Sequence, residues 1–397
     1  MTTDSASLTA SKPRFEILDG LRGVAAMLVV AYHLLETYFH DPCLHPLNHG
    51  YLAVDFFFML SGFVIGYAYD ERWGRGMSQW NFYKRRLIRL QPMVIMGGLT
   101  GAMFYYFGAS GAFPMIASVA WWQVLGIMLL AFLMFPTPPA LDIRGWAETS
   151  ALNGPQWSLM WEYLANILYA TLIRRFNKTA LTLFVLLAAV PLAMLCLNID
   201  SFGLLAGRDA LAYTVIGGWS VTADQLYIGI SRLLFPFFGG LLIYRLGMRI
   251  RFAKRGFLLC SLMLAAILCF PHMGGATPNM GNGVYILVAI ALLFPIIVMA
   301  GAGRPLKGAK TTRVCQFLGA ISYPLYITHY PLIYMQIAWV DRNPDAPLGT
   351  NIFVGVSIFF MALGIAYASL RLYDEPVREW LKNHWLYASK AKGARGK

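Results

Sequence analysis

Four ionisable side chains lie inside long apolar segments of the sequence, where charged groups are costly. They are His33, Asp55, Glu162 and His329. Two histidines and two carboxylic acids suit proton transfer, because burial and neighbouring charges can bring the pKa of an imidazole close to neutral pH. They could also bind zinc, but no His and Glu pair has the spacing of an H-E-x-x-H motif. These residue types therefore predict a polar chamber for a reaction or for transport.

Two polar residues share one predicted helix. In "LDGLRGVAAMLVVAYH", Arg22 and His33 are 11 residues apart, which is roughly 16 Å along an α-helix and within roughly 20° of the same face. The alternative interpretation is structural: an arginine that reaches the membrane interface and a histidine satisfied by a neighbouring helix.

Two further segments carry stripes of polar residues at helical spacing. One holds Ser158, Glu162 and Asn166, and the other holds Ser322, Tyr326 and His329. Residues spaced by three or four positions lie on one face of a helix. His33 and Asp55 lie on two other predicted helices, 17–39 and 51–69. Together, the four helices are predicted to bring His33, Asp55, Glu162 and His329 to a similar depth in the membrane.

A basic stretch, "NFYKRRLIRLQP", places Arg86 and Arg89 at i and i+3 on one helix face. Guanidinium groups bind phosphate in bidentate fashion, so with Arg22 they could hold a multiply phosphorylated ligand. The alternative is an anchor of basic residues beside lipid headgroups. Arg232 is another cation inside an apolar segment, and the sequence identifies no partner for it.

The elements that position these residues are apolar segments of membrane-spanning length. The 397 residues are 58% hydrophobic and 13% charged, and runs of about 17–25 apolar residues are long enough to cross the bilayer core. The sequence predicts an all-α, polytopic membrane protein. The candidate segments are 17–39, 51–69, 88–108, 119–136, 156–173, 180–198, 227–246, 256–271, 283–301, 315–338 and 351–371.

The basic residues predict the orientation of these segments. The net charge of +13 is spread over clusters between apolar segments and forms no continuous face, which argues against nucleic-acid binding. Lys and Arg accumulate on the cytoplasmic side, and the clusters share one side only if 119–136 does not cross. We therefore expect about ten transmembrane helices, one re-entrant or interfacial segment, and both termini in the cytoplasm.

The rest of the chain carries less predicted chemistry. The five cysteines have neither disulfide nor metal-ligand spacing. His40, His45 and His49 lie in a predicted external loop, where a weak metal site is the less favoured interpretation. We expect a disordered cytoplasmic tail at 1–14, a transmembrane domain at 15–375 and a basic cytoplasmic tail at 376–397, with no cleavable signal peptide.

Six motifs in order resemble the acyltransferase-3 family of bacterial membrane proteins. They are "LDGLRGVAAMLVVAYH", "VDFFFMLSGFVIG", "FYKRRLIRLQP", "WSLMWEY", "RLLFPFFGGLLIYRLG" and "ISYPLYITHYPL". The family's arginine–ten residues–histidine element corresponds to Arg22 and His33, and its R-x-x-R element to Arg86 and Arg89. Its tryptophan–serine–leucine–x–x–glutamate element corresponds to Trp157, Ser158, Leu159 and Glu162. The resemblance implies the stand-alone form, without a fused extracytoplasmic domain.

The resemblance implies an O-acyltransferase of the bacterial cytoplasmic membrane, with acetyl as the expected acyl group. Acyl-coenzyme A would serve as co-substrate from the cytoplasm, with no tightly bound cofactor or metal, and an extracytoplasmic glycan or small hydroxylated molecule would be the acceptor. The segment 109–155 is long enough to form a lid over that acceptor. The sequence indicates no oligomeric state.

The expected roles follow from that chemistry. Arg22, Arg86 and Arg89 would bind the phosphates of the donor. His33 would act as general base or carry the acyl group, and Glu162 or Asp55 would orient it. His329, Tyr326, Ser322, Ser158 and Trp157 would support the catalytic groups or the substrates. Two rivals use the same residues: a proton-coupled transporter of a small anion or saccharide, and a non-catalytic membrane scaffold.

Overall fold

The computed structural model describes residues 14–39, 44–251, 255–306 and 308–386. His40, Cys43, the predicted tail 1–14 up to residue 13, and residues 387–397 of the predicted tail 376–397 lie outside the described residues. The first half of that second tail, 376–386, is described and continues the last helix. Within the described ranges the chain is helical and forms no β-sheet, which confirms the predicted all-α class. The helices are α1 Glu16–Glu36, α2 Ala53–Trp73, α3 Gln79–Phe104, α4 Trp121–Phe132, α5 Gln156–Thr171, α6 Lys178–Cys196, α7 Ala223–Leu246, α8 Gly256–Leu268, α9 Met280–Val288, α10 Phe294–Gly301, α11 Ala309–Thr328, α12 Tyr330–Arg342, α13 Leu348–Ser369 and α14 Glu375–Leu381.

Seven helices in the described residues are long and apolar enough to cross a membrane. They are Glu16–Glu36, Gly50–Trp73, Gln79–Gly108, Lys178–Cys196, Ala223–Leu246, Met280–Gly301 and Leu348–Leu386. Two wider turns, Ala289–Leu293 and Leu370–Asp374, make α9 continuous with α10 and α13 continuous with α14. These helices are consistent with a multi-pass membrane protein, and the predicted count of ten is not reached by this measure.

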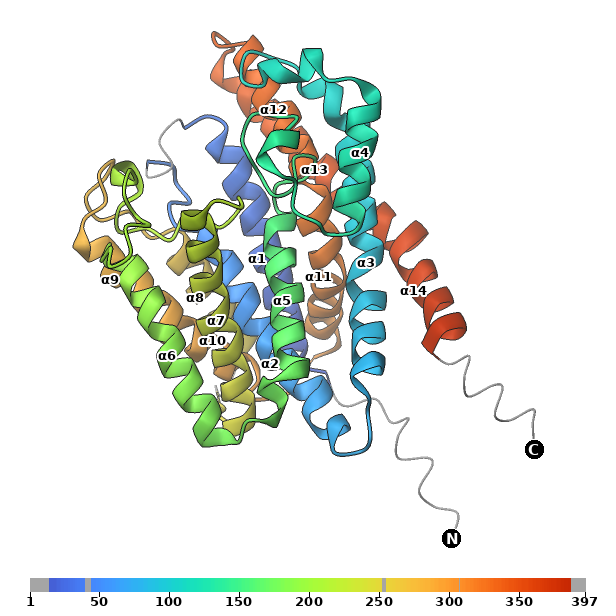
Figure 1. Ribbon diagram of the computed structural model, residues 1–397, viewed down its shortest axis with the longest axis vertical. Coiled ribbons are helices and arrows are strands. Elements are labelled where there is room, and N and C mark those ends of the chain that lie inside the picture. The colour runs from blue at the N-terminus through green and yellow to red at the C-terminus, as the bar shows by residue number, and fades with distance from the viewer. Residues whose placement is uncertain (1–13, 40–43, 252–254, 307, 387–397) are drawn as a thin grey trace.

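The difference in count comes from short and interrupted helices. The predicted segments 156–173 and 256–271 form α5 and α8, of 16 and 13 residues, which are shorter than the roughly 20 residues of a typical span. The segment 119–136 forms α4, whose 12 residues extend only about 18 Å. This helix lies beside the upper part of α3 (Figure 1), and its length is compatible with a segment that does not cross.

The predicted segment 315–338 is divided at His329 into α11 and α12. Pro331 stands in the first turn of α12. A proline has no backbone N–H, and its ring would clash with the carbonyl of the residue four positions earlier if the helix continued. The break therefore places His329 at a helix junction inside the bundle, where it is fully buried.

Several helix ends have clear sequence causes. The side chains of Ser78, Asn177 and Asn279 cap the N-termini of α3, α6 and α9 by accepting a backbone N–H. Gly247 ends α7 with φ +69°, a left-handed conformation that costs glycine little. These local signals determine where the spans begin and end.

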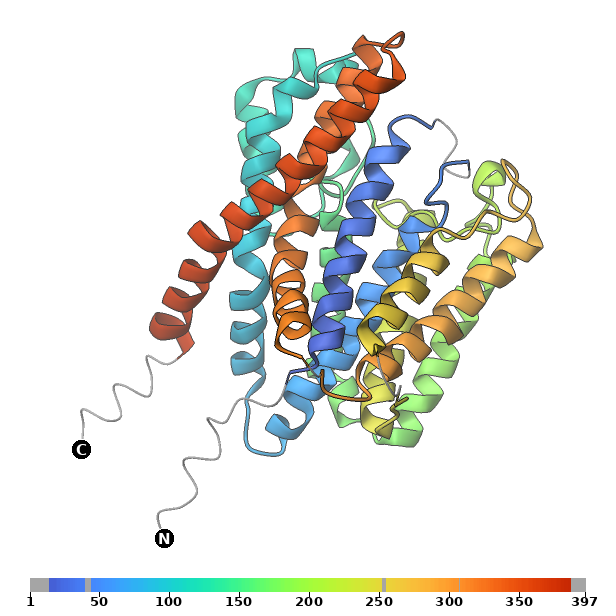
Figure 2. The same cartoon turned by 180° about the vertical axis from the view of Figure 1, so that it is seen from behind.

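Two helix pairs bring the polar residues together. α1 packs against α11, and α2 packs against α7, along much of their lengths (Figures 1 and 2). Glycines make the approach possible, because a Cβ atom at Gly23 would lie 2.5 Å from the Leu318 carbonyl oxygen. A Cβ atom at Gly240 would lie 2.0 Å from the Met59 carbonyl oxygen. Small residues at such contacts allow membrane helices to pack closely.

We expect Gly240→Ala to destabilise the bundle, because its methyl group would overlap the backbone of α2. Overpacking of this kind costs about 1–3 kcal/mol. The neighbouring Gly239→Ala is the matched control, since a Cβ atom there meets nothing within 4 Å. Thermal unfolding of the purified protein in detergent checks this; equal Tm values for the two variants would contradict the proposed close contact.

Candidate active site

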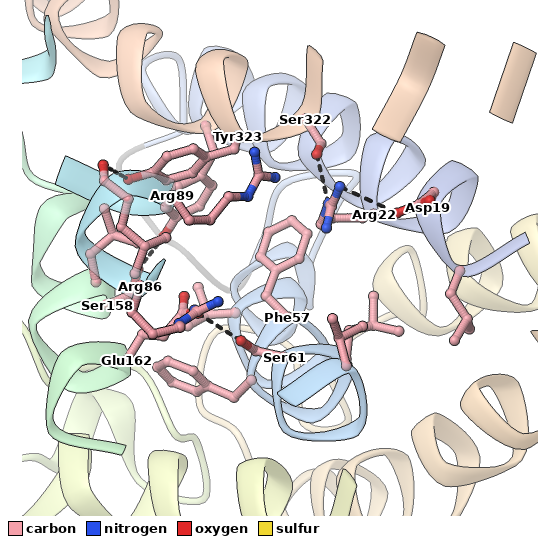
Figure 3. A pocket seen from close by; sticks show the side chains of 18 residues that line it. Asp19, Arg22, Phe57, Ser61, Arg86, Arg89, Ser158, Glu162, Ser322 and Tyr323 are labelled. Carbon is pink, nitrogen blue, oxygen red and sulfur yellow. Dashed lines mark hydrogen bonds and ion pairs between the residues drawn. The ribbon is translucent and has the colours of Figure 1, made fainter. Parts of the chain in front are cut away.

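The three arginines selected from the sequence line one pocket. Arg22 comes from α1, while Arg86 and Arg89 come from α3 (Figure 3). The pocket has a volume of about 150 Å³ and is also lined by Ser61 of α2 and Glu162 of α5. We call it the arginine pocket. It gathers cationic groups from two helices that are distant in the sequence.

The arginines differ in how far their hydrogen-bonding groups are already engaged. Arg22 donates to the Ser322 hydroxyl and to the Gly319 carbonyl oxygen, both at 2.8 Å. Arg86 forms an ion pair with Glu162 at 2.7 Å. Within the described ranges, no hydrogen bond or ion pair engages Arg89, whose guanidinium lies 5.9 Å from the centre of the Tyr323 ring. Arg89 is therefore the arginine best able to bind an anion.

The prediction that Glu162 lies at the same depth in the bundle as His33 is wrong. Its carboxylate accepts hydrogen bonds from Ser61 at 2.6 Å and from Arg86 at 2.7 Å, so it lies in the arginine pocket and not beside His33. α5 begins deep in the bundle because the preceding segment folds inward, with Ala151, Leu152 and Asn153 fully buried. Glu162 is thus displaced towards the arginines.

The partner of His33 is Glu36, a residue that the sequence interpretation missed. The His33 Nδ1 atom lies 2.8 Å from a Glu36 carboxylate oxygen. Both residues are on α1 at i and i+3, a spacing that makes helical side chains neighbours, so the signal was present in the sequence. Glu36 holds Nδ1 and leaves Nε2 for other partners.

Two aromatic groups from the helix junction surround His33. The ring of His329 stacks against it with centroids 5.5 Å apart, and the Tyr330 ring meets it edge-on at 4.8 Å. The His329 Nδ1 atom lies 2.9 Å from the Tyr326 carbonyl oxygen, so it must carry the proton. The structure therefore brings His33 and His329 together, as the sequence interpretation expected.

Asp55 contacts Arg232 and not His33. The two side chains form an ion pair at 2.7 Å and are almost completely buried. Arg232 also donates to the Tyr51 carbonyl oxygen at 2.8 Å, and its guanidinium lies over the Trp157 ring at 5.3 Å. Asp55 is thus the partner of Arg232 that the sequence did not reveal, and the expectation that it orients His33 is wrong.

His33 opens into a cavity of about 410 Å³, which we call the histidine chamber. Its lining includes His33, Glu36, Glu148, Trp157, Arg232 and Tyr326. A further cavity of about 370 Å³ shares His33, Glu36, Trp146 and Tyr330 with this chamber. A chamber of this size suits a small molecule or one sugar unit.

Tyr326 stands between the arginine pocket and the histidine chamber. It lines both cavities, as does Val54. The Tyr326 hydroxyl is hydrogen-bonded to the Ser158 hydroxyl at 2.8 Å. The predicted support residues therefore lie at this boundary, with Ser158 and Ser322 on the arginine side and Trp157 on the histidine side.

The predicted loop histidines have structural partners. His49 lies 2.7 Å from the Phe270 carbonyl oxygen and stacks on His272 with ring centroids 4.3 Å apart. Burial lowers the pKa of His49 to about 4. His45 accepts a hydrogen bond from the Leu47 backbone N–H at 3.2 Å. In the described part of the chain, no three His, Cys, Asp or Glu residues form a group that could hold a metal ion.

Comparison with known proteins gives one family and several relatives. The family model described as an acyltransferase domain, of the acyltransferase-3 type, matches residues 15–385. The chain is 34% identical over 185 residues to protein 2 in picA locus of Rhizobium radiobacter, and the match covers 45% of this chain and 93% of that protein. No solved structure matches the chain significantly.

Two relatives match nearly the whole chain at 22% identity. They are the putative peptidoglycan O-acetyltransferase YrhL of Bacillus subtilis and the peptidoglycan O-acetyltransferase OatA of Listeria monocytogenes. Each match covers 91% of this chain. The chain spans about half the length of these relatives, 54% and 55% respectively.

We expect Arg232→Met to destabilise the protein by about 3–5 kcal/mol, because it leaves the Asp55 carboxylate buried without a cation. Adding Asp55→Leu should restore most of the lost stability, since replacing a buried ion pair by apolar residues of similar volume often leaves the stability unchanged. Arg251→Met, at an exposed position, is the control. Thermal unfolding in detergent measures all three; a double variant no more stable than the single one would contradict this account of the pair.

Proposed function

The chain belongs to the acyltransferase-3 family, as its motifs predicted, and from this premise we propose that it is a membrane-bound O-acyltransferase. It transfers an acyl group, acetyl in the first place, from acyl-coenzyme A to a hydroxyl group of an extracytoplasmic glycan or related acceptor. The names of two relatives support O-acetylation of a glycan. The observation that carries the proposal is the His33–Glu36 pair, which faces a chamber that adjoins the arginine pocket.

The arginine pocket is the donor site in this proposal. Coenzyme A carries several phosphate oxygens, which guanidinium groups bind through charge-assisted hydrogen bonds. Arg89 binds a phosphate in this proposal. Arg22 and Arg86 line the same pocket and offer further N–H donors, although Asp19 and Glu162 already neutralise part of their charge. Roughly 16 Å of helix separates Arg22 from His33, a distance suited to the extended pantetheine arm, which would pass Tyr326 and deliver its thioester to the histidine chamber.

His33 is the reactive group of the proposed transfer. Glu36 holds Nδ1 and stabilises the imidazolium, and Nε2 removes the proton from the acceptor hydroxyl. The hydroxyl oxygen forms a bond to the thioester carbonyl carbon while the carbon–sulfur bond breaks. The thiolate leaves and takes the proton from His33, so the products are an O-acyl ester and free coenzyme A. In a covalent variant, Nε2 itself accepts the acyl group first.

The proposed location is the bacterial cytoplasmic membrane. The basic clusters beside Arg22 and around Arg86 mark the cytoplasmic side, where acyl-coenzyme A is available. His33 then faces the opposite side with the predicted external segments. The chain thereby moves an acyl group across the membrane without moving coenzyme A.

We expect His33→Ala to lower acyl transfer by about 10²–10⁴-fold, the usual contribution of a general base. Glu36→Gln should retain more activity, with a loss of at least about 10-fold, because Glu36 is partly exposed and screened by solvent. The assay measures transfer from radiolabelled acetyl-coenzyme A to envelope glycans of a cell that lacks the protein. His384→Ala, an exposed histidine near the end of the described chain, is the control.

Undiminished transfer by His33→Ala would remove the proposed role of this residue. If the wild type transfers no acyl group but moves a solute in response to a proton gradient, the transporter is the correct function. A labelled protein adduct trapped by acid quenching, and lost in His33→Ala, would identify the covalent route.

We expect Arg89→Ala to raise the KM for acetyl-coenzyme A by about 10- to 100-fold, because a charge-assisted hydrogen bond contributes about 1.5–3 kcal/mol. Arg89→Lys should recover part of the loss, since it keeps the charge but not the planar fork. Arg75→Ala, at an exposed site, should leave the KM unchanged. Initial rates over a range of donor concentrations measure the effect, and an unchanged KM in Arg89→Ala would refute phosphate binding by this residue.

A further inference from the structure

Glu148 is a buried carboxylic acid that has no role in the acyl transfer proposed for His33. It lies in the segment between α4 and α5, only 7% exposed, and it lines the histidine chamber with His33 and Glu36. One carboxylate oxygen accepts a hydrogen bond from the Tyr334 hydroxyl at 2.5 Å. Glu148 thus enters the chamber from a different part of the chain than His33.

The Tyr334 ring is itself held in place by a cation. The Arg144 guanidinium lies 3.5 Å from the centre of this ring, and its Nε donates to the Ala151 carbonyl oxygen at 2.9 Å. Rings of Tyr105 and Phe113 cover Arg144 at 5.2 and 5.1 Å. Arg144 therefore fixes Tyr334, and Tyr334 fixes the Glu148 carboxyl group.

A purely structural role does not explain why the Glu148 carboxylic acid is buried here. In the described part of the chain, no basic side chain forms an ion pair with Glu148, although Arg144 lies only four positions earlier in the sequence. A buried acid that forms no ion pair costs free energy, and such groups are concentrated at functional sites. The carboxyl group is therefore placed where a bound molecule can complete its hydrogen bonds.

The rest of the chamber indicates the chemistry of that molecule. Its lining includes the three tryptophans Trp146, Trp157 and Trp219. Flat aromatic walls suit the apolar C–H faces of a sugar ring, and a carboxylate suits the hydroxyl groups at its edge. A hydroxyl-rich ring satisfies both kinds of surface.

We propose that Glu148 binds a hydroxyl group of the acceptor and that Tyr334 positions Glu148 for this contact. The acceptor is a saccharide unit whose ring lies between the tryptophan side chains, with one hydroxyl on Glu148 and the reacting hydroxyl at His33. Glu148 thereby selects which hydroxyl group is acylated. This inference rests on the proposed acyltransferase function.

The surroundings of Glu148 also predict a pH dependence. The groups whose charge or hydrogen bonding acts on Glu148 are Tyr334, Arg144, Asp142 and Glu36. The chamber is also lined by the titratable residues His33, Arg232, Tyr32, Tyr51, Tyr326 and Tyr330. Burial, the largest cause, raises the pKa of Glu148 to about 7, against smaller lowering effects of Tyr334 and Arg144. The ionised carboxylate is the stronger hydrogen-bond acceptor, so the acceptor KM should fall as pH rises through about 7.

We expect Glu148→Gln to raise the acceptor KM by about 10- to 100-fold above pH 7 and to remove its pH dependence. The KM for acetyl-coenzyme A should change by less than about twofold, because the donor site is separate. Tyr334→Phe, which keeps the ring over which Arg144 lies, should raise the acceptor KM about threefold. Glu379→Gln, an exposed acid, is the matched control.

The experiment uses the purified full-length chain in lipid nanodiscs, acetyl-coenzyme A, and envelope glycans from the source bacterium lacking the gene. Tm values confirm that each variant folds. If Glu148→Gln does not fold, Tyr334→Phe tests the same hydrogen bond. No transfer by the wild type would overturn the proposed function itself. Transfer by the wild type, with an acceptor KM and pH profile unchanged in both variants, would overturn the role of Glu148 alone.

Discussion

A charge inside a hydrocarbon layer must find its partner within the protein, and this constraint organises the interior of the molecule. Arg232 pairs with Asp55 and Arg86 pairs with Glu162, each at 2.7 Å between helices that are distant in the sequence. Removing such charges from water costs several kcal/mol per ion unless the pair is well formed. The pairs therefore fix how α2, α3, α5 and α7 lie relative to one another.

The same constraint separates structural groups from groups available for chemistry. A side chain whose hydrogen bonds are all made inside the protein contributes to the architecture, as Asp55 does. His33 is different, because Glu36 holds one ring nitrogen and the other remains for a substrate. Arg89 and Glu148 also lack an ionic partner among the described residues. Both line cavities, and the availability of these groups connects the architecture to the proposed reaction.

The arrangement of the cavities depends on two interruptions of regular structure. The junction at His329, enforced by Pro331, brings a second imidazole and Tyr330 against His33. The segment before α5 folds inward, which places Glu148 in the histidine chamber. It also starts α5 deep in the bundle, so that Glu162 lies in the arginine pocket. The first interruption divides the predicted helix 315–338, and the second belongs to the segment 109–155, for which the sequence predicts a lid.

The sequence by itself determined the local features of this protein. Helical periodicity places Arg22 and His33 on one face of α1, and places Arg86 beside Arg89, because these relations depend only on spacing within one helix. The family motifs and the apolar composition are likewise properties of the chain alone. The Glu36 partner of His33 belongs to this local class, because it lies three positions further along the same helix.

Only the tertiary structure decided which acid meets which base. Depth in the bundle depends on where each helix begins, and pairing depends on how helices rotate against one another. Both are set by contacts such as Gly240 against the Met59 carbonyl group. Asp55 and Glu162 could each have faced His33 by spacing alone. The packing of α2 on α7, and the inward start of α5, directed them to arginines instead.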